Sequence, residues 1–260
     1  MALIEVRALV KRFGGLMAVN DVSFVIDSGA IVSMIGPNGA GKTTAFNCVT
    51  GLYPITSGEV LFDGASIAGQ PPHRILRLGI ARTFQNIRLF SYMTALDNVM
   101  VGAHWWMRAR IWDSILKTPR ARADERRVAE RAHDLLEKLG LGRYAGSYAR
   151  ELPYGLQRRL EIARALASQP RVLLLDEPAA GLNPQEKKEL MALIARLRHE
   201  GLTIFLIEHD MRVVMEISDR IVVLDHGVKI TEGIPAEVRA NPQVIEAYLG
   251  HGAAEKMAGA

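Results

Sequence analysis

A glycine-rich run in the first fifth of the chain has residue types and a spacing suited to holding phosphate. Residues 36–43 read Gly-Pro-Asn-Gly-Ala-Gly-Lys-Thr, which fits the pattern G-x-x-x-x-G-K-[ST]. Glycines let the backbone pass close to an anion, so that successive N–H groups and a helix N-terminus can point at phosphate oxygens. The Lys42 ammonium can reach the outer phosphates, and the Thr43 hydroxyl suits Mg²⁺. The run therefore predicts a binding site for a nucleoside triphosphate.

A second group of candidate residues follows two apolar runs later in the chain. Residues 172–175 are typical of a buried strand, and Asp176 and Glu177 come directly after them. At a strand end beside the phosphates, Asp176 can hold Mg²⁺ through water, and Glu177 can orient or deprotonate an attacking water. His209 follows the apolar run 203–207, where it would face the same ligand crevice. Taken alone, two surface acids and a structural histidine are the simpler interpretations.

Strand and helix patterns predict how these residues are positioned. The run 30–35 before the glycines reads as a strand and 42–49 after them as a helix, as a phosphate-binding loop requires. Alternation of strands and helices in the last third of the chain predicts a parallel sheet with helices on its faces. Further strands are expected at 3–6, 22–26, 59–62, 172–175, 203–207 and 221–224, and helices at 128–139, with Gly140 as its stop, and 190–197.

Length and composition limit the class of protein. The 260 residues are 49% hydrophobic, enough for one sizeable core, or a core with a smaller lobe. No secretory signal is recognisable, and no run approaches the roughly 18 apolar residues of a membrane span. The single cysteine, Cys48, excludes an internal disulfide and fits a reducing compartment. We interpret Cys48 as a small buried hydrophobe rather than as a reactive thiol.

The net charge of +4 is local. Between His104 and Arg131, eight basic residues accompany four acidic ones, so the whole excess lies in this segment. That distribution argues against a nucleic-acid-binding surface. Trp105, Trp106 and Trp112 lie among the arginines. The segment is either a solvated helical hairpin whose aromatic side chains pack on a helical lobe, or a contact with lipid headgroups or a membrane subunit.

In their order along residues 3–250, these pieces resemble the ATP-binding cassette (ABC) ATPases. The resemblance implies that residues 36–43 are the Walker A loop, and that Asp176 and Glu177 are the Walker B aspartate and the catalytic glutamate. It further implies that Phe13 stacks on adenine, that Gln85 touches Mg²⁺ and senses a membrane subunit, and that His209 contacts the γ-phosphate. The implied ATP contacts are Phe13, Gly36, Pro37, Asn38, Gly39, Ala40, Gly41, Lys42, Thr43, Thr44 and Gln85, with Mg²⁺ at Thr43, Gln85 and Asp176 and catalysis by Glu177 and His209.

The family signature, usually Leu-Ser-Gly-Gly-Gln, is altered in this chain. Residues 152–156 read Leu-Pro-Tyr-Gly-Leu, so that Pro153 replaces the serine and Tyr154 the first glycine. In the family this segment crosses a dimer to contact the other subunit's ATP, and proline brings neither a hydroxyl nor an N–H. The helix N-terminus behind Gly155 would still supply a dipole. The implied contacts in trans are Pro153, Tyr154, Gly155, Leu156 and Gln157, and the D-loop is Gly181, Leu182 and Asn183, with Asn183 where an aspartate is common.

Several of these stretches together look like the ATP-binding subunit of a bacterial high-affinity branched-chain amino acid importer. They are residues 82–90, the Pro-Tyr-Gly signature, and residues 180–184, 207–211 and 246–250. Importers of urea or short-chain amides are similar and remain an alternative. Export of lipid-linked cargo and a non-transport ABC ATPase are further alternatives, although the latter class usually carries two cassettes or a long coiled coil.

The resemblance also implies an α/β architecture and a set of partners. We expect a P-loop NTPase (RecA-like) core with an N-terminal antiparallel β subdomain at 1–85 and 168–235, a helical subdomain at 86–167, a C-terminal helix at 236–250 and a flexible tail at 251–260. The implied partners are two permease subunits and a second ABC ATPase, with a periplasmic or extracellular substrate-binding protein acting indirectly. Pro153 favours a paralogue as the second ATPase, in a heterodimer with unequal sites. The expected location is the cytoplasmic face of the bacterial inner membrane.

Overall fold

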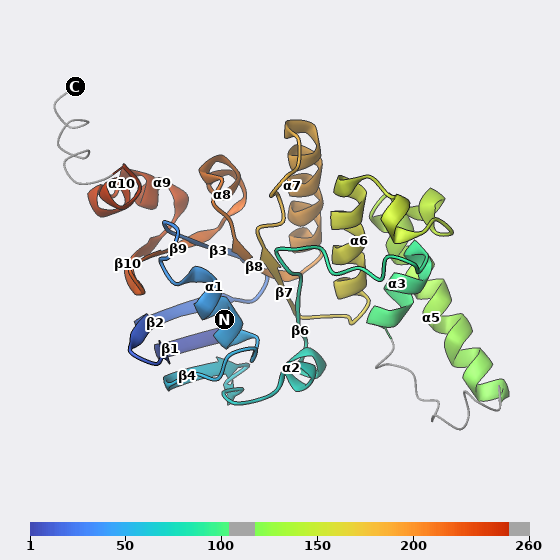
Figure 1. Cartoon of the computed structure of the whole chain (residues 1–260), viewed down its shortest axis with the longest axis horizontal. Helices are drawn as coiled ribbons and strands as arrows, with labels where there is room; N and C mark the ends of the chain where they lie inside the picture. The colour runs from blue at the N-terminus through green and yellow to red at the C-terminus, as the bar shows by residue number, and fades with distance from the viewer. Residues whose placement is uncertain (104–117, 250–260) are drawn as a thin grey trace. The chain divides into compact units, whose positions relative to one another are not determined.

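The computed structural model describes residues 1–103 and 118–249 (Figure 1). Its strands are β1 (Ala2–Phe13), β2 (Leu16–Asp27), β3 (Ile31–Ile35), β4 (Ser57–Phe62), β5 (Ala65–Ser66), β6 (Ile80–Arg82), β7 (Val172–Asp176), β8 (Thr203–Ile207), β9 (Arg220–Asp225) and β10 (Val228–Gly233). Its helices are α1 (Lys42–Val49), α2 (Pro72–Leu78), α3 (Ala95–Gly102), α5 (Pro119–Lys138), α6 (Tyr154–Leu166), α7 (Pro184–His199), α8 (Met211–Ile217), α9 (Pro235–Ala240) and α10 (Pro242–Leu249), with 3₁₀ turns at Gly142–Tyr144 and Ala149–Glu151.

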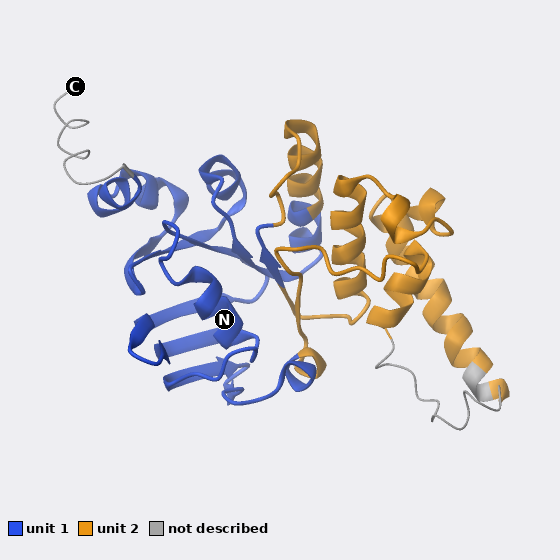
Figure 2. Cartoon of the chain, viewed as in Figure 1, with its two compact units in different colours: residues 1–75, 174–177, 194–260 blue, residues 76–173, 178–193 orange. Residues whose placement is uncertain are grey.

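The chain divides into two compact units (Figure 2). Unit 1 consists of residues 1–75, 174–177 and 194–260, and unit 2 consists of residues 76–173 and 178–193. The phosphate-binding run, the two acids and His209 belong to unit 1. Gln85, the altered signature and the D-loop belong to unit 2.

The N-terminal strands of unit 1 form an antiparallel sheet with the order β2-β1-β4-β5. Ile4 of β1 pairs with Ile26 of β2 on one side and with Phe62 of β4 on the other. All three side chains are buried, because alternate residues of an antiparallel strand point to the same face. This sheet confirms the predicted antiparallel β subdomain.

A second sheet carries the ends of the strands on which the candidate site depends. Its order is β10-β9-β3-β8-β7-β6, and β3 runs parallel to both β8 and β9. Every residue of β3, β7 and β8 is buried, as expected for central parallel strands. The parallel sheet is thus confirmed, whereas β6 and the antiparallel edge strand β10 were not predicted.

Aromatic packing joins the elements of unit 1 around Phe205 of β8. Its ring stacks on Phe24 of β2 and on Phe46 of α1, with centroids 5.5 Å apart in each pair. Phe205 and Phe46 are fully buried. Cys48 of α1 is also buried, and burial raises the pKa of its thiol to about 11. This agrees with the interpretation of Cys48 as a small hydrophobe.

Helices α3, α5 and α6 build unit 2. A Cβ at Gly102 would lie 2.1 Å from the carbonyl oxygen of Arg164, so a glycine permits the close approach of α3 and α6. A capping box starts α3, in which Asp97 N–H donates to Thr94 Oγ1 at 3.1 Å and Thr94 N–H donates to Asp97 Oδ2 at 3.3 Å. The predicted helix at 128–139 is the second half of α5, which ends at Lys138 before Gly140, whose φ is +72°.

The C-terminal stretch differs from the prediction of one helix at 236–250. It forms two short helices, α9 and α10, separated at Asn241. The residue before a proline avoids the helical region, and Asn241, which precedes Pro242, has ψ of 120°. Trp105, Trp106, Trp112, the first part of the basic segment and the predicted tail at 251–260 lie outside the described residues.

Candidate functional site

Backbone geometry shapes the phosphate-binding loop between β3 and α1. Gly36 has φ +151°, and a Cβ there would lie 2.1 Å from the carbonyl oxygen of Leu224. Gly41, the N-cap of α1, has φ +94°, and its Cβ would lie 2.5 Å from the carbonyl oxygen of Ala18. Glycine is therefore required at both positions. The first N–H groups of α1 have no partner within the helix and can receive an anion.

The Lys42 side chain folds back onto this loop and bonds to its backbone. Its Nζ donates to the carbonyl oxygens of Gly36 at 2.7 Å and Pro37 at 2.9 Å, and the residue is 8% exposed. Burial lowers the pKa of Lys42, while the negative charges of Glu177 and Asp176 oppose that shift. The ammonium thus lies within the electrostatic reach of both acids at the end of β7.

The end of β7 brings Glu177 toward His209. Asp176 is the last residue of the strand and is buried, whereas Glu177 takes a left-handed φ of +46°. This conformation costs a non-glycine residue roughly 1–2 kcal/mol and redirects the side chain. Glu177 N–H donates to the carbonyl oxygen of Ile207 at 2.9 Å, and Glu177 Oε2 lies 3.5 Å from His209 Nδ1. The two predicted catalytic residues are therefore neighbours.

Glu208 is an acid of this region that the sequence analysis did not select. It is fully buried after β8, and its Oε2 accepts from its neighbour's backbone N–H, that of His209, at 3.2 Å. The same oxygen lies 3.9 Å from His209 Nδ1. The available signal in the sequence was an acid directly after an apolar strand, and only the adjacent histidine was selected.

Phe13 forms an exposed aromatic corner with a second missed residue, Tyr53. The two rings meet edge to face with centroids 5.3 Å apart. Lys11 Nζ lies 4.7 Å from the Phe13 centroid and donates to the carbonyl oxygen of Pro54 at 2.8 Å. Phe13 is 41% exposed, so part of its surface can receive a flat ring. Tyr53 lacked any motif that would have singled it out.

In unit 2, the altered signature starts helix α6. Pro153 is the N-cap, and Tyr154, Gly155 and Leu156 form the first turn. The helix therefore begins one residue before Gly155 rather than behind it. Gln157 turns its side chain inward, donating from Nε2 to the carbonyl oxygen of Leu152 at 2.8 Å. The first-turn N–H groups remain the donors that this segment can offer to an anion.

In unit 2, the D-loop and the first turn of α7 each approach the signature at one point. The position of a Cβ at Gly181 would lie 3.2 Å from the Tyr154 ring, and a Cβ at Gly155 would lie 2.6 Å from a carboxylate oxygen of Glu186. Asn183 N–H donates to Glu186 Oε2 at 3.0 Å, and Glu186 N–H donates to Asn183 Oδ1 at 2.9 Å. This reciprocal pair caps α7, so asparagine performs here the capping that an aspartate would also perform. Gly155 leaves room for the Glu186 side chain.

Gln85 is exposed in unit 2, and its main chain is bonded to α6. Its carbonyl oxygen accepts from Arg158 Nη2 at 2.5 Å. Across residues 1–103 and 118–249, no helix is long and apolar enough to cross a membrane. The predicted residues thus fall into two groups. Lys42, Asp176, Glu177 and His209 gather in unit 1, and Gln85, the signature and the D-loop gather in unit 2.

Known protein families match two stretches of this chain. Residues 19–180 match the family described as ABC transporter. Residues 228–254 match a second family, described as branched-chain amino acid ATP-binding cassette transporter.

Individual relatives resemble the chain over almost its whole length. The high-affinity branched-chain amino acid transport ATP-binding protein BraF of Pseudomonas aeruginosa is 52% identical over 249 residues, which cover 95% of this chain and 98% of that protein. The corresponding LivG of Escherichia coli K12 is 51% identical with the same coverage. A solved nucleotide-free ATP-binding cassette from an ABC transporter has a TM-score of 0.85 at 30% identity and covers 96% of this chain and 100% of its own. Another such cassette, in its ADP conformation, has a TM-score of 0.84 at 31% identity.

Proposed function

The chain belongs to the ATP-binding cassettes of ABC transporters, and from this premise we propose that it powers a bacterial importer of branched-chain amino acids. The names of the relatives and the match at residues 228–254 support this substrate class. The single observation that carries the chemistry is the gathering of a buried lysine, two acids and a histidine around the loop at 36–43 in unit 1.

We assign ATP to that loop. Its glycines admit the phosphates, the first N–H groups of α1 donate to them, and Lys42 contributes a positive charge. Phe13 offers a face to the adenine ring, and Tyr53 supports Phe13 from the side. The proposed ATP contacts are Phe13, residues 36–44 and Gln85.

The residues present also fit Mg²⁺. The Thr43 hydroxyl, the Asp176 carboxylate and the side-chain carbonyl of Gln85 are hard oxygen donors of the kind that Mg²⁺ prefers. When bound, the ion would offset charge on the phosphates. Glu177 would orient or deprotonate the attacking water, and His209, beside it, would contact the γ-phosphate.

We propose that the site is completed by a second cassette, whose ATP meets residues 153–157 and the D-loop residues 181–183. The signature lacks the serine hydroxyl, and Pro153 lacks an N–H, so its donors reduce to the first-turn N–H groups of α6. A paralogue that keeps its serine would then form the stronger site with this chain's own phosphate loop. The working dimer would be a heterodimer with unequal sites.

The remaining partners follow from the family. Two permease subunits would receive the force of ATP-driven closure, and a periplasmic or extracellular binding protein would deliver the substrate. The chain would lie at the cytoplasmic face of the inner membrane. We assign the helical subdomain to residues 86–167 and the nucleotide-binding core to 1–85 and 168–235.

Replacement of Glu177 by Gln tests the catalytic assignment. Because the amide keeps the shape but cannot take a proton, Glu177→Gln should lower ATP turnover at least about 100-fold while ATP still binds. Phosphate release and equilibrium ATP binding measure the two effects. Glu216→Gln, on an exposed acid of α8, is the matched control and should leave both unchanged. A Glu177→Gln variant with near wild-type turnover would remove the base assignment.

Co-purification from membranes tests the transport assignment. Two permeases and a paralogous ATPase should accompany the chain, whereas recovery with ribosomes or DNA would contradict the proposal. In the complex, Lys42→Ala should reduce transport more than the same change in the paralogue. Equal loss from the two changes would contradict the unequal sites and leave the ATPase itself standing.

A further inference from the structure

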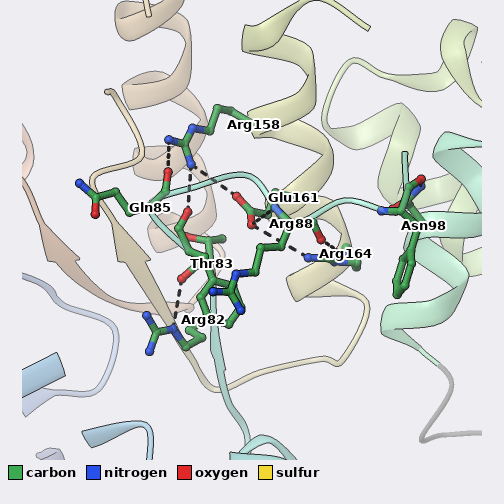
Figure 3. Close-up of polar contacts among 10 residues, drawn as sticks. Arg82, Thr83, Gln85, Arg88, Asn98, Arg158, Glu161 and Arg164 are labelled. Atoms are coloured by element: carbon green, nitrogen blue, oxygen red, sulfur yellow. Dashed lines mark hydrogen bonds and ion pairs between the residues drawn. The ribbon is translucent and has the colours of Figure 1, made fainter. Parts of the chain in front are cut away.

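A network of buried charges in unit 2 holds the loop around Gln85 against helix α6. Figure 3 shows its members, which come from α6 and from the segment 82–90 that begins at the end of β6, together with Asn98 of α3. None of the charged side chains in this network is required by the chemistry assigned above. Their contacts are made mainly with the main chain of the loop, not with its side chains.

Arg158 is the centre of the network. Its Nη1 donates to the carbonyl oxygen of Phe84 at 3.0 Å, and its Nη2 donates to that of Gln85 at 2.5 Å. The residue is 3% exposed, and its guanidinium carbon lies 5.5 Å from the centroid of the Tyr154 ring. One side chain therefore reaches both the backbone at Gln85 and the first residue of the signature helix.

Glu161, one turn further along α6, complements Arg158. It is 2% exposed, and its Oε2 lies 3.5 Å from Arg158 Nη1. Its Oε1 accepts from Arg88 N–H at 3.3 Å and lies 4.0 Å from Arg164 Nη2. Burial raises the pKa of Glu161, and the Arg88 N–H and the two arginine charges oppose this rise. Arg164 also donates to the carbonyl oxygen of Arg88, so the loop is held on both sides of Gln85.

Filling a core with such a network of charges is energetically unfavourable. Removing charges from water is unfavourable, and apolar residues of similar volume often stabilise a fold as well or better. The charged side chains also fix the direction of their partners, because Arg158, Arg164 and Glu161 bond to the carbonyl oxygens of Phe84, Gln85 and Arg88 and to the Arg88 N–H. The Gln85 side chain stays exposed while its main chain is fixed.

We propose that Arg158 and Glu161 are positioning residues that join the backbone at Gln85 to the first turn of α6. A displacement of the loop is then passed through Arg158 to Tyr154, and from the Tyr154 ring to Gly181 of the D-loop, where an added Cβ would lie 3.2 Å from the ring. This inference rests on the proposed function for the meaning of the signature, although the linkage itself concerns unit 2 alone. The tyrosine that replaces the family glycine supplies the ring in this path.

The test compares Arg158→Met with Arg159→Met. Arg159 is the next residue of the same helix, but it pairs with Glu189 of α7 and not with the loop. In the full-length chain, Arg158→Met should speed amide hydrogen exchange at residues 84–88 by about tenfold or more, because two carbonyl anchors are lost. Arg159→Met should leave these rates unchanged.

The same variants are then measured in the complex with its permeases. Arg158→Met should lower kcat for ATP by about tenfold with KM within about twofold, because the phosphate loop is untouched while the signature is misplaced. Arg158→Lys, which keeps the charge but loses the two-pronged contact, should recover part of kcat.

A double variant separates positioning from folding. Arg158→Met combined with Glu161→Leu removes both members of the 3.5 Å pair and leaves Arg164 bonded to the Arg88 carbonyl oxygen, so thermal stability should recover in part relative to Arg158→Met alone. Exchange at 84–88 should remain fast and kcat low. Recovery of kcat together with stability would overturn the proposal, as would equal exchange in Arg158→Met and Arg159→Met. A wild-type complex without ATPase activity would instead remove the proposed function, while the exchange rates still decide the linkage.

Discussion

Two loops of this chain are held in place by different means. The loop at 36–43 depends on glycines that let the backbone pass close to its neighbours, since a Cβ at Gly36 would lie 2.1 Å from the Leu224 carbonyl oxygen. The loop at 84–94 depends on side chains from elsewhere, namely Arg158 and Glu161 of α6 and Asn98 of α3. The first loop keeps its shape because its glycines have no Cβ, and the second keeps its shape because side chains of α6 and α3 bond to its backbone.

This difference bears on what each loop can do. A loop fixed by close backbone contacts keeps one shape, which suits a cradle for phosphates. A loop hung from a few long side chains can be moved by moving those side chains, which suits a segment that transmits displacement. The contrast predicts that substitutions in the two regions fail in different ways.

The largest effect is expected at Gly36. An added methyl group in Gly36→Ala must displace the Leu224 carbonyl, at a cost of about 3 kcal/mol or more, which is a hundredfold in ATP affinity. Equilibrium ATP binding by the purified chain measures this loss. Gly64→Ala is the control, since Gly64 also has positive φ, +77°, but nothing lies within 4 Å of its Cβ. Comparable losses of affinity in both variants would show that φ, not crowding, matters.

An intermediate effect is expected at Asn98. Its Oδ1 accepts from Phe90 N–H at 2.9 Å, and its Nδ2 donates to the carbonyl oxygens of Phe90 at 3.1 Å and Thr94 at 3.0 Å. Asn98→Ala leaves Phe90 N–H without its acceptor, although the carbonyl oxygens of Phe90 and Thr94 keep the backbone N–H groups of Met93 and of residue 98 as donors. The free energy of unfolding should fall by about 1–2 kcal/mol. Chemical denaturation measures this, with exposed Asn20→Ala as the control. ATP affinity should not change, and a loss of affinity would contradict the separation of the two loops.

The smallest effect concerns Cys48, on the helix that follows the phosphate loop. Because burial raises its thiol pKa to about 11 from 9, little thiolate exists at pH 8 in the native chain, and alkylation by iodoacetamide should be about 100-fold slower than in the unfolded chain. The unfolded thiol ionises first as the pH rises, so folding stability should fall between pH 9 and about 11. Mass spectrometry follows the alkylation.

Cys48 labelling also compares the two loops directly. Gly36→Ala should speed the reaction, because it disturbs the support of α1, whereas Asn98→Ala should not. Faster labelling in both variants would mean that the two loops open together.

The same contrast explains what sequence could and could not predict. The spacing of Gly36, Gly39 and Gly41 before Lys42 is a local pattern, and α1 begins and ends at the predicted residues. The strands β3, β7 and β8 were found because buried parallel strands are continuous apolar runs. Edge strand β10 was missed because its residues are mixed in polarity and half-buried.

Contacts between distant residues had no comparable pattern. Arg158 lies more than seventy positions from Phe84 and Gln85, and nothing in Gln-Arg-Arg-Leu-Glu distinguishes the buried Arg158 from Arg159. Tyr53 and Glu208 likewise could be assigned to the candidate site only from their spatial neighbours, Phe13 and His209. The break between α9 and α10 was predictable from Pro242, because the residue before a proline avoids the helical conformation, but the prediction of one helix at 236–250 ignored this signal.

Helix α10 has a consequence for the phosphate-binding loop. Val244 and Tyr248 of α10 pack in one hydrophobic cluster with Ile35, the residue directly before the phosphate loop. They lie within residues 228–254, the stretch that matches the narrower family, while Ile35 lies within the stretch that matches the broad one. The stretch that matches the narrower family thus packs against the residue that leads into the phosphate-binding loop, so a substitution at Val244 or Tyr248 is expected to shift that loop through Ile35.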